Sequence, residues 1–169
     1  MLSSLRALFE WVNEFPTSVA IRESIYVYPG LLTAHVVGMA IFVGLVLMMD
    51  LRLMGMGNTS TPLTQIQRRL FPWQMRGMAL STATGLALVY AQPMRFYGNV
   101  FFWEKAVMML LAGVNAWAFH SSTYRSVAKW DNEAKTPFGA RLSGAVSVAL
   151  WVLVVISGRL IAYNWFNPI

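Results

Sequence analysis

The sequence predicts an all-α fold, namely an integral membrane four-helix bundle with an N-terminal amphipathic interfacial helix. Hydrophobic residues make up 57% of its 169 residues and charged residues only 12%, whereas soluble domains carry roughly 25% charged residues. The formal net charge is +6. In so apolar a chain, this excess of Lys and Arg is more typical of membrane topology than of nucleic-acid binding. We therefore expect a lipid bilayer as a partner and no nucleic acid.

Residue counts also exclude several kinds of site. The chain has no cysteine, which excludes disulfides, iron–sulfur clusters and covalently attached c-type haem. Its two histidines are too few for a His-cluster zinc site. We find no Gly-rich phosphate loop, no Ser–His–Asp order and no carboxylate pair. We therefore expect no soluble-type catalytic site and name no catalytic residue.

Residues 1–28 differ from the rest of the chain because their apolar positions recur at helical spacing among charged ones. These apolar positions are Leu5, Leu8, Phe9 and Val12. Pro16 ends this pattern. We interpret the segment as an amphipathic helix that lies in the interface plane. A helix packed on the end of the bundle and facing water is the alternative.

Four later stretches are long and nearly free of charge. A helix needs about 20 apolar residues to cross the hydrocarbon core, and backbone groups in lipid must be satisfied within the helix. We expect spans at about 29–50, 73–93, 100–121 and 140–163, which together form one bundle over residues 29–169. Gly77, Ser81 and Gly85 form a stripe of small residues that favours close helix packing, within the bundle or in a homo-oligomer.

Ionisable residues inside spans indicate a candidate functional site. Counted from the span ends, His35, Lys105, Arg159 and Arg95 share one layer near the outer surface. We interpret this layer as a candidate b-type haem site, with His35 as axial ligand to the iron and Met109 as a weak sixth ligand. The three cationic residues would pair with the propionates. Alternatively, His35 bonds a neighbouring carbonyl while the cations reach toward headgroups.

The second histidine belongs to a different layer. His120 lies about 22 Å along the helix from Lys105, at 1.5 Å of rise per residue. The two histidines therefore cannot ligate one iron. With Asp50, Arg52 and Arg76, His120 forms an inner layer, which we interpret as a structural clasp at the span ends.

Four segments resemble a bacterial family of four-span inner-membrane proteins with no assigned function. They are HVVGMAIFVGLVLMMDLRLMG in the first span, the Thr84–Gly85 pair, the run from WEK to NAWAFH, and SGRLIAY in the last span. The resemblance covers roughly residues 25–165 and brings no chemistry with it.

More distantly, the chain is similar to four-helix membrane protoporphyrinogen oxidases and to copper-resistance D-type proteins. The matching positions are His35 early in a span, Gly44 after it, and Lys105 opening a later span. In the oxidases the early histidine is associated with b-type haem, so the resemblance implies haem at His35. The oxidases' Asn-Glu-x-Pro run before the last span is replaced by Arg141-Leu-Ser-Gly-Ala, which argues against porphyrinogen oxidation itself.

Three functions are compatible with these features. The first is a small haem-binding membrane protein with a redox or electron-relay role and a membrane redox partner. The second is a non-catalytic subunit or scaffold of a larger membrane complex. The third, which rests on the copper-resistance resemblance, is a copper or small-solute permease.

The distribution of Lys and Arg predicts the orientation in a bacterial inner membrane. Eight lie on the side of the first and third connections and five on the other side, and the richer side faces the cytoplasm. Both termini should therefore be periplasmic, with residues 59–67 and 128–136 cytoplasmic. An alkaline phosphatase fused after Ile169 should be active, and a fluorescent reporter active only in the cytoplasm should be dark there. The opposite pattern would reverse this topology.

Overall fold

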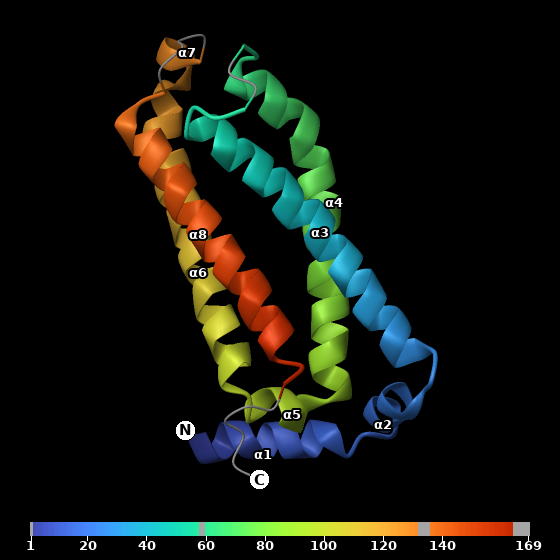
Figure 1. The fold of residues 1–169 in the computed structure, drawn as a ribbon. Coiled ribbons are helices and arrows are strands. Elements are labelled where there is room, and N and C mark those ends of the chain that lie inside the picture. The colour runs from blue at the N-terminus through green and yellow to red at the C-terminus, as the bar shows by residue number, and fades with distance from the viewer. Residues whose placement is uncertain (1, 58–59, 132–135, 164–169) are drawn as a thin grey trace.

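The computed structural model describes residues 2–57, 60–131 and 136–163, and these residues form helices and connections without a strand. Four long helices form an elongated bundle in which consecutive long helices run in opposite directions (Figure 1). They are α3 (Val27–Leu53), α4 (Leu63–Ala91), α6 (Val100–Ser121) and α8 (Phe138–Leu160). The short helices at the two ends are α1 (Leu2–Asn13), α2 (Pro16–Glu23), α5 (Pro93–Tyr97), η1 (Thr123–Ser126) and α7 (Val127–Trp130). The prediction of an all-α fold is confirmed.

Three helical stretches in the described part of the chain are long and apolar enough to cross a membrane. They are α3, the stretch Val100–Trp130 that begins with α6, and α8. Helix α4 is not among them, because Gln74, Arg76 and several hydroxyl side chains lower its apolar content. Residues 59, 132–135 and 164–169, where parts of the predicted cytoplasmic connections and the C-terminus lie, are outside the described residues.

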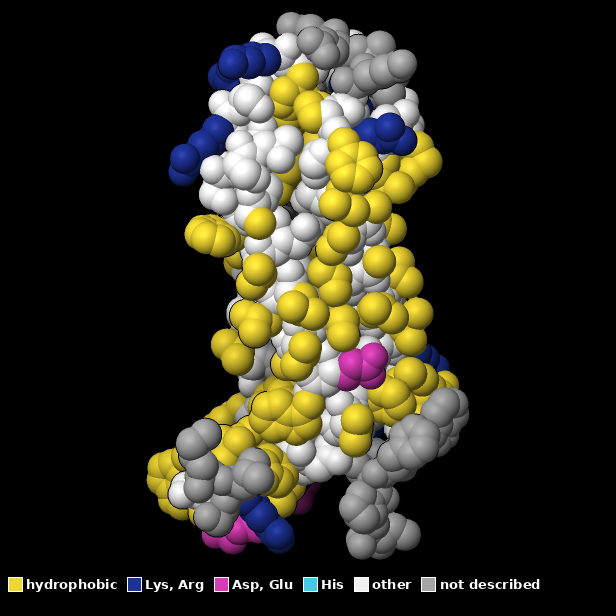
Figure 2. All heavy atoms as spheres, turned by 90° about the vertical axis from the view of Figure 1, so that its left-hand side faces the viewer, with side chains coloured by type: hydrophobic (Ala, Val, Ile, Leu, Met, Phe, Trp, Pro, Cys, Tyr) yellow, Lys and Arg dark blue, Asp and Glu magenta, His cyan; other side chains and the backbone are white. Residues whose placement is uncertain are grey.

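The bundle exposes its large apolar side chains and buries small and polar ones. Leu86 on α4 is 67% exposed and Trp117 on α6 is 72% exposed, whereas Ser81 and Ser157 are buried. Figure 2 shows the face formed by α6 and α8, where hydrophobic side chains cover the middle and Lys and Arg gather mainly near the two ends. Exposed apolar surface of this extent is typical of contact with lipid or protein.

Helices α3 and α4 meet backbone to backbone at a pair of glycines. A Cβ atom added at Gly38 would lie 2.8 Å from the backbone nitrogen of Ser81, and one added at Gly77 would lie 2.8 Å from that of Phe42. Without a hydrophobic drive in lipid, helices associate through such close contacts. The stripe of small residues predicted on α4 therefore packs against α3.

The other contacts leave one side of the bundle open. Helix α8 packs against α3, where a Cβ atom added at Gly144 would lie 2.8 Å from the carbonyl oxygen of Asp50. Helix α6 packs along α8. In the described part of the chain, α4 and α6 make at most marginal contact. The helices are thus joined in the order α4–α3–α8–α6, and a seam remains between α4 and α6.

Helix α4 begins at Leu63, well before the predicted span at 73–93. Leu63 is buried in a cluster with Leu53, Phe119 and Trp130, and the carboxylate of Asp131 accepts a hydrogen bond from the backbone nitrogen of the adjacent Thr64. These tertiary contacts extend the helix across Pro72, although a proline removes one helical hydrogen bond. The predicted start of the span at residue 73 was based on the distribution of charge, which carries no information on these tertiary contacts.

The N-terminal segment forms two helices, with a break at Pro16. Helix α1 lies across the end of the bundle beneath α5 (Figure 1). There the rings of Phe9 and Tyr97 pack together with their centroids 5.3 Å apart. Helix α2 is tied to α4, because the hydroxyl of the fully buried Ser18 donates to the carbonyl oxygen of Tyr90 at 2.9 Å. Leu8 and Trp11 remain exposed on α1.

Replacement of Gly77 by Leu should destabilise the bundle, because the side chain would force α3 and α4 apart. Overpacking typically costs about 1–3 kcal/mol. Gly44→Leu is the matched control, since a Cβ atom there would meet nothing within 4 Å. In detergent, the midpoint of thermal unfolding followed by tryptophan fluorescence should fall for Gly77→Leu and change little for Gly44→Leu. Equal midpoints would mean that the glycine crossing does not hold the two helices together.

Candidate functional site

His35 lies on α3 and is half-buried against α4. Its Nδ1 atom is 2.9 Å from the carbonyl oxygen of Ser81 and 3.3 Å from the hydroxyl oxygen of Thr84. That hydroxyl already donates to the carbonyl oxygen of Leu80 at 2.6 Å. Both partners of His35 are therefore acceptors, so Nδ1 carries the proton and donates. In the neutral ring, Nε2 then keeps its lone pair, and it has no hydrogen-bond partner among the described residues.

A glycine makes room for this ring. A Cβ atom added at Gly85 would lie 3.0 Å from Cε1 of His35 and 3.3 Å from Nδ1, closer than a side chain normally approaches. The Thr84–Gly85 pair therefore has two distinct roles. Thr84 accepts a hydrogen bond from the imidazole, and Gly85 leaves the space that the ring occupies.

Lys105 reaches the same level of the bundle from α6. Its Nζ atom would be 3.4 Å from a Cβ atom added at Gly158 on α8, so a glycine again makes room for a functional side chain. The side chain is half-buried and forms no hydrogen bond or ion pair within the described part of the chain. Among the described side chains, Lys105 is the charged group that acts electrostatically on the imidazole of His35.

The structure does not bring the other predicted site residues to this pair. Arg159 is exposed, donates to the hydroxyl of Tyr163 at 2.9 Å and lies over the ring of that residue. Arg95 on α5 donates to the side-chain oxygen of Gln92 at 3.0 Å. Met109 is 44% exposed and lines a cavity between the long helices. Arg159 and Arg95 thus have polar partners of their own, whereas neither Nε2 of His35 nor the ammonium group of Lys105 has one among the described residues.

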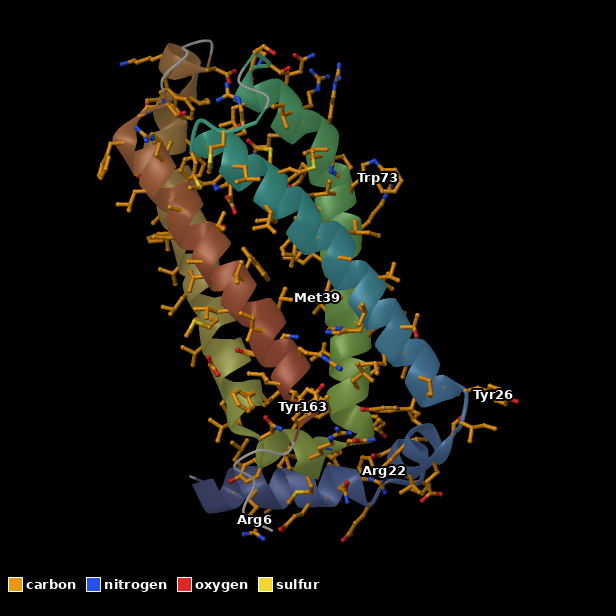
Figure 3. All side chains as sticks on the ribbon, in the orientation of Figure 1. Arg6, Arg22, Tyr26, Met39, Trp73 and Tyr163 are labelled. Carbon is orange, nitrogen blue, oxygen red and sulfur yellow. The ribbon has the colours of Figure 1, made fainter. Side chains whose placement is uncertain are left out.

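The cavity that Met109 lines has a volume of about 450 Å³ and is lined by residues of all four long helices. Its walls are rich in sulfur and aromatic rings, and Met39 on α3 points into the space between the helices (Figure 3). The methionines are Met39, Met49, Met75, Met78 and Met109, and the aromatic residues are Phe42, Phe71, Phe119 and Trp151. No spacing or charge pattern in the sequence predicted this cavity.

Polar side chains form one end of the cavity. Asp50 is 6% exposed, and Ser147 on α8 lies beside its carboxyl group. The second carboxyl oxygen, Oδ2, is buried without a hydrogen-bond partner. Beside it, the amide of Asn115 donates to the carbonyl oxygen of Ser143 at 3.0 Å and accepts from the Ser143 hydroxyl at 3.3 Å. The i, i+4 spacing of Ser143 and Ser147 was the available sequence signal for this end.

The predicted clasp of the inner layer does not form around Asp50. Arg76 is exposed and lies over the Trp73 ring at 4.7 Å, and Trp73 points away from the bundle (Figure 3). Arg52 donates to the carbonyl oxygen of Thr61. Position along the spans alone suggested that Arg52 and Arg76 are partners of Asp50. In the structure their side chains extend from the helices in different directions.

His120 also has partners of its own. Its Nδ1 atom is 2.9 Å from the carbonyl oxygen of Ala116, and its Nε2 atom is 3.5 Å from the side-chain nitrogen of Gln67 on α4. His35 contacts the same helix at Ser81, about 21 Å farther along at 1.5 Å of rise per residue. The two histidines therefore occupy different levels, as their spacing predicts.

The geometry can be compared with known proteins. The described residues contain no group of three or more His, Asp or Glu side chains that could hold a metal ion. No curated protein and no solved structure matches the chain. A model of a family of unknown function, DUF6644, matches residues 8–164, which include all four long helices and the His35–Lys105 pair. The chain therefore belongs to the DUF6644 family, whose function is unknown.

Proposed function

We propose that the chain is a multi-pass protein of the bacterial inner membrane in which α4 is a fourth span. Helix α4 has 29 residues, about 43 Å of helix, and packs along α3. Its polar residues Gln74, Ser81 and Thr84 are buried, whereas Leu86 and Phe71 are exposed. These three side chains thus lower the mean hydropathy of α4 without facing lipid. Polar groups that face the interior of a bundle are the usual arrangement in membranes.

The end of the bundle that carries α1 has features of a membrane interface. Tyr26, 80% exposed, points outward from the corner between α2 and α3 (Figure 3). Trp11 and Leu8 are exposed on α1. Amphipathic aromatic rings concentrate at the headgroup level, and an amphipathic helix across this end would place its apolar residues there. We therefore propose that α1 lies in the interface.

We further propose that the His35–Lys105 pair binds a b-type haem. The observation that carries this proposal is the orientation of His35, whose Nδ1–H donates to a backbone carbonyl while Nε2 has no partner among the described residues. Metal-ligating histidines almost always donate their other ring N–H in this way. Nε2 of His35 would bind the haem iron, and the ammonium group of Lys105 would pair with a propionate.

The proposed role follows from this chemistry. Haem supplies one-electron redox chemistry when bound, so we propose electron relay with a membrane redox partner. His35 would hold the iron, the Ser81 carbonyl would keep the imidazole in one tautomer, and Lys105 would neutralise negative charge inside the bundle. Three predicted site residues take no part in this proposal, because they have contacts of their own: Arg95, Arg159 and Met109. His35 would be the one protein ligand to the iron.

Three variants and one absorption spectrum test the haem site. Purified with haem in excess, the wild-type protein should show a Soret band, and His35→Ala should lose it because the axial nitrogen is gone. His120→Ala is the matched control and should keep the band. The contact of His120 on α4, Gln67, lies about 21 Å along that helix from Ser81, the contact of His35. Lys105→Ala should keep the band but release haem several-fold more readily, because propionate pairing contributes affinity rather than the iron bond.

Two results would contradict this assignment. Loss of the band in His120→Ala together with its retention in His35→Ala would place the haem elsewhere. A colourless wild-type protein would instead favour a non-catalytic subunit, which should then co-purify with a stoichiometric partner. Thermal unfolding of each variant shows whether a lost band reflects lost ligation or lost structure.

A further inference from the structure

The 450 Å³ cavity is lined by both helices that flank the seam between α4 and α6, where the bundle is not closed. Its lining includes exposed side chains from both helices, namely Phe71 and Met78 on α4 and Met109 on α6. In a membrane this seam faces the acyl chains, so a molecule dissolved in the bilayer could enter sideways. A volume of 450 Å³ lies within the range of small-molecule sites, about 300–1,000 Å³.

The inner end of the cavity holds an acidic group that lacks a counter-charge. Ser147 is the polar neighbour of the Asp50 carboxyl group, while the Oδ2 atom of that group is buried without a hydrogen-bond partner. The described residues contain a single ion pair, Arg6–Glu10 on α1, at the other end of the molecule. The neighbouring Arg52 directs its guanidinium group to the carbonyl oxygen of Thr61. A buried carboxylate without a partner is costly, and a ligand with positive charge would remove that cost.

The walls suit the apolar part of such a ligand. The rings of Phe42 and Trp151, both of which line the cavity, meet edge to face with their centroids 5.0 Å apart. Aromatic faces attract organic cations, and methionine side chains adapt to ligands of irregular shape. Among the described residues, no Lys or Arg lines the cavity. Besides Asp50, its described lining contains one other titratable side chain, His120, which has its own partners in the Ala116 carbonyl and Gln67.

We propose that this cavity binds a lipophilic organic cation, such as a substituted ammonium or phosphonium ion, with its charge against Asp50. The ligand enters through the seam between α4 and α6 and places its apolar substituents among the methionines and aromatic rings. This site differs in position and chemistry from the His35–Lys105 pair, and it does not depend on haem binding.

A pair of probes with the same shape and opposite charge tests the proposal. Binding of tetraphenylphosphonium and tetraphenylborate to the purified protein in detergent is measured by isothermal titration calorimetry. Tetraphenylphosphonium should bind at least tenfold more tightly, although the net charge of +6 favours the anion at nonspecific sites. Equal affinity, tighter binding of the borate, or no binding of the phosphonium ion would overturn the proposal.

Two variants with matched controls locate the site. Asp50→Asn keeps the side-chain shape and removes the charge, so it should weaken tetraphenylphosphonium binding at least tenfold. Glu104→Gln neutralises a half-buried acid on α6 that does not line the cavity, and should leave the affinity unchanged. Equal effects of the two variants would mean that Asp50 is not the specific counter-charge.

Gly113 tests the seam itself. It lines the cavity, and a Cβ atom added there would meet nothing within 4 Å. Gly113→Leu should therefore fill part of the entrance without displacing the backbone and weaken tetraphenylphosphonium binding several-fold, whereas Gly44→Leu outside the cavity should not. Unchanged binding in Gly113→Leu would contradict entry through the seam. In all these variants a Soret band that depends on His35 should persist, so failure of one site is distinguishable from failure of the other.

Discussion

At the middle of the bundle, α3 and α4 touch through their main chains where Gly38 faces Gly77. In a bilayer, apolar side chains gain little by leaving lipid, so helix pairs depend on contacts of this closeness. The crossing also positions functional groups. His35 lies one turn before Gly38, and the approach of the two backbones brings its ring to the carbonyl oxygen of Ser81 and over Gly85. Larger residues at the crossing would move the imidazole away from both.

A second close crossing, between Gly144 of α8 and the backbone of α3 at Asp50, fixes the other half of the bundle. Because α3 makes both crossings, it holds the α6–α8 pair and α4 on its two sides. No comparable contact joins α4 to α6 within the described residues. The cavity follows from this arrangement, and so does the position of Asp50, which lines the cavity beside the crossing with Gly144.

The sequence predicted those features that depend on periodicity, length and depth. Charge-free length identified the regions of α3, α6 and α8, and depth placed His35 and Lys105 in one layer. Depth did not reveal the direction of a side chain, and therefore Arg159, which turns to Tyr163, was grouped with them. For the same reason Asp50 was expected among cationic partners, whereas Ser147 on α8 is its neighbour. The start of α4 and the cavity depend on distances between helices, which no spacing rule within one helix supplies.

The two groups of the His35–Lys105 pair each occupy space left by a glycine on the neighbouring helix, Gly85 for the imidazole and Gly158 for the ammonium. The acceptor that fixes the ring is a main-chain carbonyl, which substitution of the Ser81 side chain leaves in place. The geometry of this site is therefore encoded largely by positions without side-chain chemistry. Within this family, a comparison restricted to polar residues would overlook the determinants of ring orientation. Variation at the two glycines is the more informative record of whether a relative retains the same site.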